Sequence, residues 1–461
     1  MTSDRLAELL APWLDAGPAY LGLAAGLRGL ALDGRLPVGT RIASERQLAL
    51  VLGVSRNTIT AAYDVLRSEG YLASARGGGS RVTLPAAVPA RPDAVPGERP
   101  DIWDLSVAAL PAPAALIDSV TEAALALHPL LAGHGLYPLG LPETREAVAD
   151  HLTRRGLSTR ADQVLITNGS LHGWDLLLRA LTRPGVRVLV EQPTYPAVLD
   201  AVMSHRLRPV AFPVTGQGWE MPAPATALAH LIPDGQNPTG FLATTAQRRN
   251  LLRQLRAEVI ACDETFADLV LDGSPPVPLG ALDERVVTLG SMSKAFWAGL
   301  RVGWVRADRD TLTRLAQIRA GTDLAGPVLE QLIAARLLRR ADAVLAERRA
   351  LLRRSRDALM DALTLALPTW RFHRPAAGMV LWIEMPEARA TRLVAHALDI
   401  GLRLTAGPRF TIDGTADRWF RLPYTLPPEK VAAVVDLLVD AAGRVDSGAP
   451  PSGNKQSRWT A

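Results

Sequence analysis

The sequence contains little of several residue types, and each shortage excludes a class of protein. Its single cysteine, Cys262, excludes an intramolecular disulfide framework and fits a reducing compartment. No run approaches the roughly 20 apolar residues that a membrane-spanning helix needs. The chain does not open with a basic segment followed by an apolar core and a cleavage site, so we expect no secretory signal. These absences predict a cytoplasmic protein without a membrane partner.

Histidine is also scarce, with eight residues in the chain. His128, His134, His172 and His205 do not have the spacing of metal ligands. We therefore expect surface or core roles for them, and no metal site.

Lysine is the rarest of the basic residues. Only Lys294, Lys430 and Lys455 occur among 51 lysines and arginines. Lys294 lies in the run TLGSMSKAFWAGLRVGW at 288–304. Arginine stays protonated and cannot form a Schiff base, whereas lysine can, so a chemical role for Lys294 is one interpretation. The other is an ordinary solvated lysine, and the local spacing leaves both open.

The chain is long and ordinary in its apolar content. Its 461 residues, 48% of them hydrophobic, predict two to four domains with ample material for a core. The net charge of +5 is modest and does not by itself indicate a nucleic-acid partner.

The first 84 residues have the pattern of a small helical domain with a hairpin. Apolar residues repeat at helical spacing over 18–33, and Ser44 and Ser55 are each placed to cap a following helix. Strand-like segments at 71–74 and 80–84 then flank a glycine-rich tip. This order is typical of a winged helix-turn-helix, whose last helix enters the major groove of DNA. The alternative is a three-helix interaction module with solvated polar caps.

The remaining chain changes character twice. Residues 85–101 are rich in proline and alanine and predict a linker. Short apolar runs then alternate with helical segments, which indicates an α/β domain with a mostly parallel sheet, followed by a smaller domain that includes a strand at 379–384. We expect a winged helix domain at 1–84, a linker at 85–101, the α/β part at 102–445 and a disordered polar tail at 446–461. The expected buried strands are 164–167, 186–190, 208–213, 230–233, 258–263 and 286–289, and the expected helices include 171–182, 195–204, 244–256 and long helices within 324–367.

Ligands of open α/β sheets bind beyond the carboxyl ends of the strands, so the loops there are candidate sites. Residues 168–171 open a helix whose amides would hold a phosphate. Tyr195 could stack on a flat cofactor, Asn237 could donate to a ring oxygen, and Asp263 could keep a pyridinium nitrogen protonated. Each feature also has a structural explanation. The segment 168–171 could be an ordinary strand-to-helix turn, and Tyr195 could belong to the core. Asn237 could lie in a polar turn, and Asp263 could cap a helix.

The segment from Asp33 to Leu48, followed by GVSRNTI at 53–59, resembles the GntR family of DNA-binding domains over about residues 18–84. The resemblance implies double-stranded DNA as a partner. It departs at Ala43, where the family commonly has proline, and this should alter a turn only. By this resemblance the DNA-binding residues are Arg46, Ser55, Arg56, Asn57 and Thr58, with Arg76 and Gly77 in the wing.

Taken in order, the strand-end residues over roughly 103–442 resemble the fold type I pyridoxal-phosphate enzymes of the aspartate aminotransferase superfamily. The resemblance implies pyridoxal 5′-phosphate as cofactor, with Lys294 as its Schiff-base residue and Asp263 at the pyridine nitrogen. One position departs: Phe266 stands where many of these enzymes have a tyrosine that donates to the 3′ oxygen. Phenylalanine cannot donate this hydrogen bond, so we expect different aldimine electronics from those of these enzymes.

The same resemblance implies roles for further residues. Asn237 would bond the 3′ oxygen, Tyr195 would stack on the ring, and Arg421 would grip a substrate carboxylate with its guanidinium fork. The phosphate would be held by Gly169 and Ser170, with Leu171 beside them, and by Ser291, Ser293 and Arg301, while Tyr137 would reach the phosphate of a neighbouring subunit.

A GntR-like head ahead of an aminotransferase-like domain resembles the MocR family of bacterial regulators. This implies a homodimeric transcriptional regulator that senses pyridoxal phosphate, or a small amine or amino acid that forms an external aldimine. An active aminotransferase with a regulatory head is the alternative. A third possibility is a DNA-binding protein with a cofactor-free, structural body.

Overall fold

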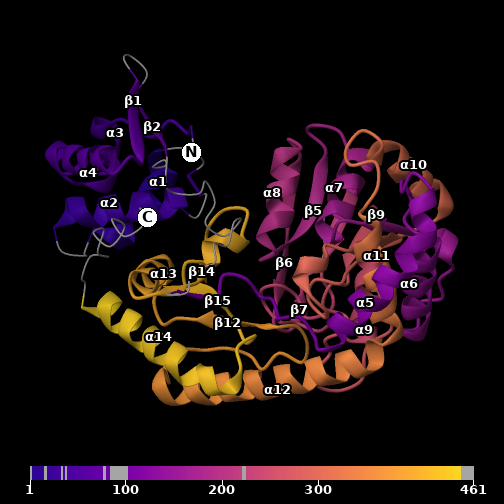
Figure 1. The fold of residues 1–461 in the computed structure, drawn as a ribbon. Helices are drawn as coiled ribbons and strands as arrows, with labels where there is room; N and C mark the ends of the chain where they lie inside the picture. The colour runs from indigo at the N-terminus through magenta and orange to yellow at the C-terminus, as the bar shows by residue number, and fades with distance from the viewer. Residues whose placement is uncertain are drawn as a thin grey trace.

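The computed structural model of the protein describes residues 3–14, 18–32, 35–36, 39–75, 79–83, 102–220 and 225–447. Figure 1 shows an N-terminal head above a small domain, with a larger α/β domain beside them. The predicted linker and the wing residues Arg76 and Gly77 lie outside the described residues. The expected fold class is confirmed, and the exact domain boundaries stay a prediction. Helix α14 continues to Asp446, the first residue of the expected tail.

The head has the predicted helix order and hairpin. Ser44 and Gln47 form the expected capping box at α3, and the Ser55 side chain accepts a hydrogen bond from the Thr58 amide at the start of α4. Gly53, with φ of 67°, ends α3 in the left-handed conformation that favours glycine. A first helix, α1, was not predicted. The elements are α1 (Ser3–Leu10), α2 (Ala19–Leu32), α3 (Glu45–Leu52), α4 (Arg56–Ser68), β1 (Leu72–Ala75) and β2 (Gly79–Val82).

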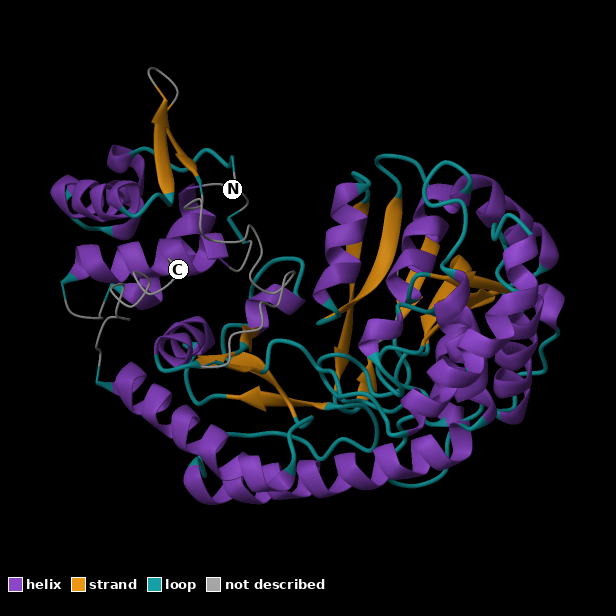
Figure 2. Cartoon of the chain, viewed as in Figure 1, coloured by secondary structure: helices purple, strands orange, loops and turns teal. Residues whose placement is uncertain are grey.

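The large domain is built on an eight-stranded sheet in the order β4-β11-β10-β9-β8-β5-β6-β7. Its centre is parallel, and β11 and β7 run antiparallel to their neighbours. Both faces are covered (Figure 2). The strands are β4 (Val164–Thr167), β5 (Arg187–Gln192), β6 (Arg208–Thr215), β7 (Gly218–Trp219), β8 (Thr226–Leu231), β9 (Ala257–Asp263), β10 (Val286–Ser291) and β11 (Gly303–Arg306).

In this sheet one predicted strand was misplaced, and two strands, β11 and the two-residue β7, were not predicted. The segment expected at 230–233 is strand Thr226–Leu231, which pairs with β5 on one side and β9 on the other. It ends before Pro233, which has no amide hydrogen to give to a sheet. Strand β11, at Gly303–Arg306, follows the lysine stretch and pairs with β4, the edge strand of the sheet. The other predicted strands are confirmed within two residues at each end.

Helices cover the two faces of the sheet because side chains of each strand alternate between them. Helices α7, α8 and α10 pack on one face, while α6, α9 and α11 pack on the other. Helix α12 runs along the base of the molecule and joins the large and small domains (Figure 1). The bounds are α5 (Ala115–Leu127), α6 (Pro142–Arg154), α7 (Ser170–Leu181), α8 (Pro196–Ser204), α9 (Thr245–Gln254), α10 (Arg309–Arg319), α11 (Val328–Arg339) and α12 (Ala341–Ala366).

The small domain has a three-stranded sheet in the order β12-β15-β14 and a short parallel pair, β13 with β3. Strand β3 comes from the segment just after the linker, so the first residues of the body belong structurally to the small domain. The elements are β3 (Trp103–Asp104), β12 (Val380–Glu384), α13 (Ala390–Asp399), β13 (Leu402–Arg403), β14 (Thr405–Ala406), β15 (Trp419–Pro423) and α14 (Val431–Asp446).

The head contacts the small domain through α13. Arg35 Nη2 donates to Thr391 Oγ1 at 2.7 Å, and the Arg392 guanidinium lies 5.8 Å from the ring centroid of Trp13. The Arg5 side chain also donates to the Asp413 carbonyl. The small domain is therefore the part of the body against which the head rests.

Candidate functional site

Lys294 follows the end of β10 in a turn that partly buries its side chain. Its Nζ donates to the Ala108 carbonyl oxygen at 2.7 Å. Burial and, after it, the nearby guanidinium of Arg421 lower the pKa of the ammonium to about 8, against the opposing effect of the Asp263 carboxylate. About a tenth of the lysine is therefore a neutral amine at pH 7, far more than for an ordinary lysine, and this is the form that attacks a carbonyl carbon.

Asp263 ends β9, the parallel neighbour of β10, in register with Leu289. Its carboxylate accepts a hydrogen bond from the Thr265 amide at 2.9 Å. Burial raises the pKa of this carboxyl, and the hydrogen bonds from Thr265 and the charge of Lys294 act against the rise. The lysine and the aspartate thus come to one edge of the sheet from adjacent strands.

A polar cradle lies at the start of α7. Arg301 donates from Nη2 to the Asn168 carbonyl at 3.1 Å and from Nη1 to Ser293 Oγ at 3.5 Å. Gly169 has φ of 87°, and a Cβ built there would stand 2.9 Å from Arg301 Nη2. The Thr265 hydroxyl donates to Ser170 Oγ at 3.1 Å and links the cradle to the aspartate loop. An anion is favoured here by a guanidinium together with a helix N-terminus.

Arg421 projects from β15 of the small domain and is buried. Its Nη1 donates to Asn237 Oδ1 at 3.3 Å, its Nη2 donates to the Ser106 carbonyl, and its guanidinium lies 5.1 Å from the ring centroid of Phe410. Hydrogen bonds therefore join the two domains across the site.

The Asn237 loop is held by a buried carboxylate that the sequence did not reveal. Glu191 accepts from Trp219 Nε1 at 2.7 Å, Gln236 Nε2 at 3.0 Å and the Ile232 amide at 3.2 Å. Burial raises the pKa of Glu191 to about 7, against the pull of those hydrogen bonds. The only signal in the sequence was a glutamate at a strand end, which is common in solvated turns.

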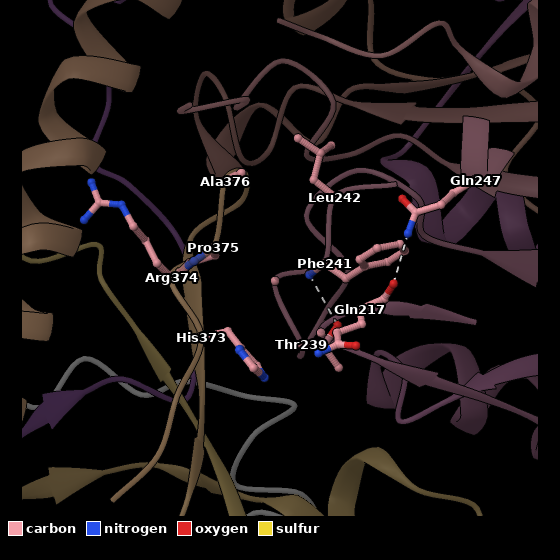
Figure 3. Close-up of a pocket in the computed structure, with 11 residues that line it drawn as sticks. Gln217, Thr239, Phe241, Leu242, Gln247, His373, Arg374, Pro375 and Ala376 are labelled. Atoms are coloured by element: carbon pink, nitrogen blue, oxygen red, sulfur yellow. Dashed lines mark hydrogen bonds between the residues drawn. The ribbon is translucent and has the colours of Figure 1, made fainter. Parts of the chain in front are cut away.

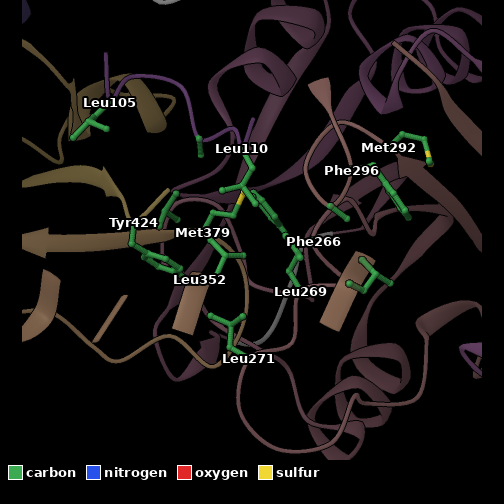
Figure 4. Close-up of a cluster of buried hydrophobic side chains, with 14 of the residues drawn as sticks. Leu105, Leu110, Phe266, Leu269, Leu271, Met292, Phe296, Leu352, Met379 and Tyr424 are labelled. Atoms are coloured by element: carbon green, nitrogen blue, oxygen red, sulfur yellow. The ribbon is translucent and has the colours of Figure 1, made fainter. Parts of the chain in front are cut away.

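Other predicted residues lie around this centre with different contacts. Ser291 Oγ accepts from the Ser293 amide at 3.1 Å. Phe266 is buried in the apolar core of the body (Figure 4), and Tyr137 packs against the same core. Tyr195 precedes α8 and packs against the apolar cluster under that helix. Leu171 remains partly exposed beside the cradle. Asn168, within the predicted segment 168–171, contributes its carbonyl oxygen to the cradle. Thr265 and Ser106 belong to the site and were not predicted as such, because their roles depend on distant partners.

Of the predicted DNA-binding residues, Ser55, Arg56, Asn57 and Thr58 lie at the start of α4, and Arg46 lies in the first turn of α3. The side chains of Arg46, Arg56 and Asn57 are exposed, and Ser55 and Thr58 form the cap. Arg56 Nη2 lies 3.7 Å from Glu45 Oε2. Among the described residues, no group of three or more His, Cys, Asp and Glu could hold a metal ion.

A separate pocket of about 260 Å³ lies beside the Asn237 loop (Figure 3). His373 faces Phe241 and Thr239 across it, and the Arg374 side chain points away from them. Its lining contains neither Lys294 nor Asp263, so it is a groove between the two domains and distinct from the lysine site.

Comparison with known proteins explains this combination. Residues 101–438 match the aminotransferase class I and II family, and residues 19–82 match the bacterial regulatory proteins of the gntR family. The fold and site thus define a GntR-type regulator fused to an aminotransferase-like domain. The chain belongs to the aminotransferase class I and II family and, with its GntR head, to the MocR-type regulators.

The similar proteins include both transcriptional regulators and an aminotransferase. The chain is 28% identical to the HTH-type transcriptional regulator YisV of Bacillus subtilis, over 86% of this chain and 89% of YisV. It is 31% identical to the pyridoxine biosynthesis transcriptional regulator PdxR of Corynebacterium glutamicum, over 64% and 67% of the two chains. The structure of LysN, an α-aminoadipate aminotransferase of Thermus thermophilus, matches with a TM-score of 0.68 and 28% identity, covering 75% of this chain and 93% of LysN.

Proposed function

We propose that this regulator binds pyridoxal 5′-phosphate at Lys294 and that its affinity for double-stranded DNA responds to that cofactor, or to a small amine or amino acid that reacts there. The observation that carries the proposal is the convergence of a partly buried lysine of lowered pKa with Asp263 and the Arg301 cradle at one sheet edge. The proposed location is the cytoplasm.

The residues present fit this cofactor. The cradle of Gly169, Ser170 and Arg301 supplies amides, hydroxyls and a cation for a phosphate, and its shape excludes a side chain at Gly169. Asp263 supplies a buried carboxylate for a protonated ring nitrogen. When bound, pyridoxal phosphate supplies an aldehyde that links to an amine and a ring that draws electrons from it.

The chain's own groups divide the remaining work. Lys294 presents the neutral amine, and Asn237 and Arg421 stand together where a ligand carboxylate would be gripped. Phe266, buried in the core, has no hydroxyl to donate. Binding groups are therefore retained while one donor of the related enzymes is missing, which supports sensing as the main role.

The direct test is an absorbance titration of the purified full chain with pyridoxal phosphate, then with amino compounds and duplex DNA. We expect a cofactor-dependent visible band, and DNA affinity that changes with the cofactor or with one amino compound. A protein that forms the band but binds DNA identically in every state would remove the sensing role and leave the cofactor site intact.

Lysine attachment should depend on pH through the lowered pKa of Lys294. The neutral amine is the reactive form, so the rate should rise through about pH 8 and level off above it. Replacing Arg421 with methionine removes a cation that disfavours the ammonium, so the midpoint should move upward. Stopped-flow absorbance after mixing with pyridoxal phosphate measures both. Arg354→Met, at an exposed position, is the control. An unchanged midpoint in Arg421→Met would contradict the proposed effect of Arg421 on the pKa of Lys294.

We also propose a homodimer, with a second copy covering α5 and the following turn η2 (His128–Ala132). Ile117, Leu125 and Leu131 are exposed there, and this surface leads to Tyr137, which by family resemblance reaches the partner's phosphate site. By length and composition alone, the helix Ala115–Ala132 is also long and apolar enough to span a membrane. We did not expect such a helix from the sequence. It contains Asp118 and Glu122, and α5 packs on α11 of the body.

The double variant Ile117→Glu/Leu125→Glu should dissociate this dimer. Both side chains are 75% exposed in the single chain, and burying a large apolar side chain stabilises an interface by about 1.5–3 kcal/mol. Charges there should weaken the dimer at least about hundredfold, as measured by sedimentation. Leu365 on α12 is 87% exposed, so Leu365→Glu is the matched control. An unchanged dimer would place the interface elsewhere.

An active aminotransferase is the second candidate, because Lys294, Asp263 and Arg421 are all present at the site. A screen of amino donors against cofactor-loaded protein tests it through the half-reaction. Absence of conversion with every donor would remove this candidate and leave the sensing proposal standing.

A further inference from the structure

The segment from Trp103 to Pro111, here called the strap, crosses the site between the two domains. At its start the Trp103 amide donates to the Gly401 carbonyl at 2.8 Å and the Leu105 amide to the Arg403 carbonyl at 2.9 Å. At its end the Pro111 carbonyl accepts from Arg348 Nη2 at 2.5 Å. The strap is therefore anchored to the small domain at one end and to α12 at the other.

Asp104 shapes the strap between these anchors. Its Oδ1 accepts from the Ser106 amide at 3.0 Å and from Ser106 Oγ at 2.5 Å. Its Oδ2 accepts from Arg403 Nη1 at 3.0 Å. The flanking side chains of Leu105 and Leu110 are buried in the apolar core (Figure 4). The Ser106 backbone is thus held in one orientation by a carboxylate that is itself ion-paired.

That orientation directs the Ser106 carbonyl at Arg421, and the next carbonyl but one, Ala108, at Lys294. Arg421 Nη2 donates to the Ser106 oxygen while Nη1 donates to Asn237. A guanidinium binds a carboxylate by two parallel charge-assisted hydrogen bonds, which are stronger than one bond to a neutral carbonyl. Each of these nitrogens carries two hydrogens, and a carboxylate that takes the pair of hydrogens now used by Asn237 and Ser106 must displace the Ser106 oxygen.

We propose that the Ser106 carbonyl is an internal competitor for the ligand carboxylate at Arg421, and that Asp104 sets the strength of this competition. The inference rests on the proposed role of Arg421 as the carboxylate-binding residue. It selects ligands with a full negative charge, because a neutral amide or ester gains too little from Arg421 to displace the strap. The strap directly follows the linker that leads from the DNA-binding head. Displacement of the strap by a ligand therefore also loosens the attachment of this linker to the body.

The test uses the full chain loaded with pyridoxal phosphate, with propionate as the charged probe and propionamide as the neutral one. Asp104→Ala should bind propionate about threefold to tenfold more tightly than the unmodified chain, because the bonds that hold the competing carbonyl are lost. Ser106→Ala, which removes only the hydroxyl bond to Asp104, should change binding in the same direction but less. Calorimetry gives the dissociation constants, and the exposed Asp361→Ala is the matched control.

Hydrogen exchange supplies a second readout. Propionate should speed exchange of the amides at 105–110 in the unmodified chain, and propionamide should not. Unchanged or weaker propionate binding by both Asp104→Ala and Ser106→Ala would overturn the proposal, since a strap that only covers the ligand would bind less tightly when loosened. If neither the unmodified chain nor Asp104→Ala binds propionate, the proposal also fails. Propionate binding that survives Arg421→Met would instead overturn the carboxylate role of Arg421 on which the inference rests.

Discussion

Replacing Lys294 with alanine is expected to abolish covalent retention of pyridoxal phosphate. Lys294 supplies the partly buried amine at the sheet edge, and its pKa of about 8 makes it more reactive near neutral pH than an ordinary lysine. Loss of a covalent link should weaken cofactor retention by on the order of a hundredfold or more, with only the cradle and Asp263 remaining. Borohydride reduction followed by peptide mapping measures the linkage, and the same sample reports whether DNA affinity still responds to cofactor.

Two matched variants separate chemistry from folding in this experiment. Lys294→Arg keeps the positive charge but cannot form the linkage, so it should lose covalent retention as well. Lys430→Ala removes a lysine whose Nζ lies 5.4 Å from the Trp103 ring centroid, and it should keep the label on Lys294. A reduced cofactor found on another residue in Lys294→Ala would show that the site has been assigned to the wrong lysine.

Replacing Arg56 with alanine is expected to weaken DNA binding about tenfold to a hundredfold, as removal of one base-contacting arginine costs about 1–3 kcal/mol. The Arg56 side chain is 71% exposed at the start of α4, the helix that would enter the major groove. Arg56 is a better target than Ser55, because the Ser55 side chain caps α4 and its loss would also cost about 1 kcal/mol of stability. Binding is measured by fluorescence anisotropy on duplexes selected by the unmodified protein from a random pool.

The control for this experiment is Arg354→Ala, which removes an equal charge from an exposed position on α12. A purely electrostatic effect of net charge would weaken DNA binding equally in both variants. Equal affinities for the unmodified chain and Arg56→Ala would contradict the placement of α4 in the groove.

Much of the candidate site was predictable because its residues follow buried strands. Ser170, Asp263 and Lys294 each come soon after an apolar run, and the carboxyl ends of parallel strands share one edge of a sheet. The capping residues Ser44 and Ser55 were equally local signals. By contrast, the strand before Asn237 was misplaced because proline and apolar residues extend past its true end at Leu231.

The sequence by itself determined the order of the parts: a winged-helix head, a proline-rich segment and an α/β body with one lysine in an unusual setting. These follow from periodicity, capping and composition, which are properties of neighbouring residues. Only the tertiary structure decided what surrounds that lysine. Arg421 and Ser106 are 315 residues apart in the chain, and Glu191 meets Gln236 across 45. Such contacts, and the burial that lowers the pKa of Lys294, arise from packing two domains together, and no local pattern encodes them.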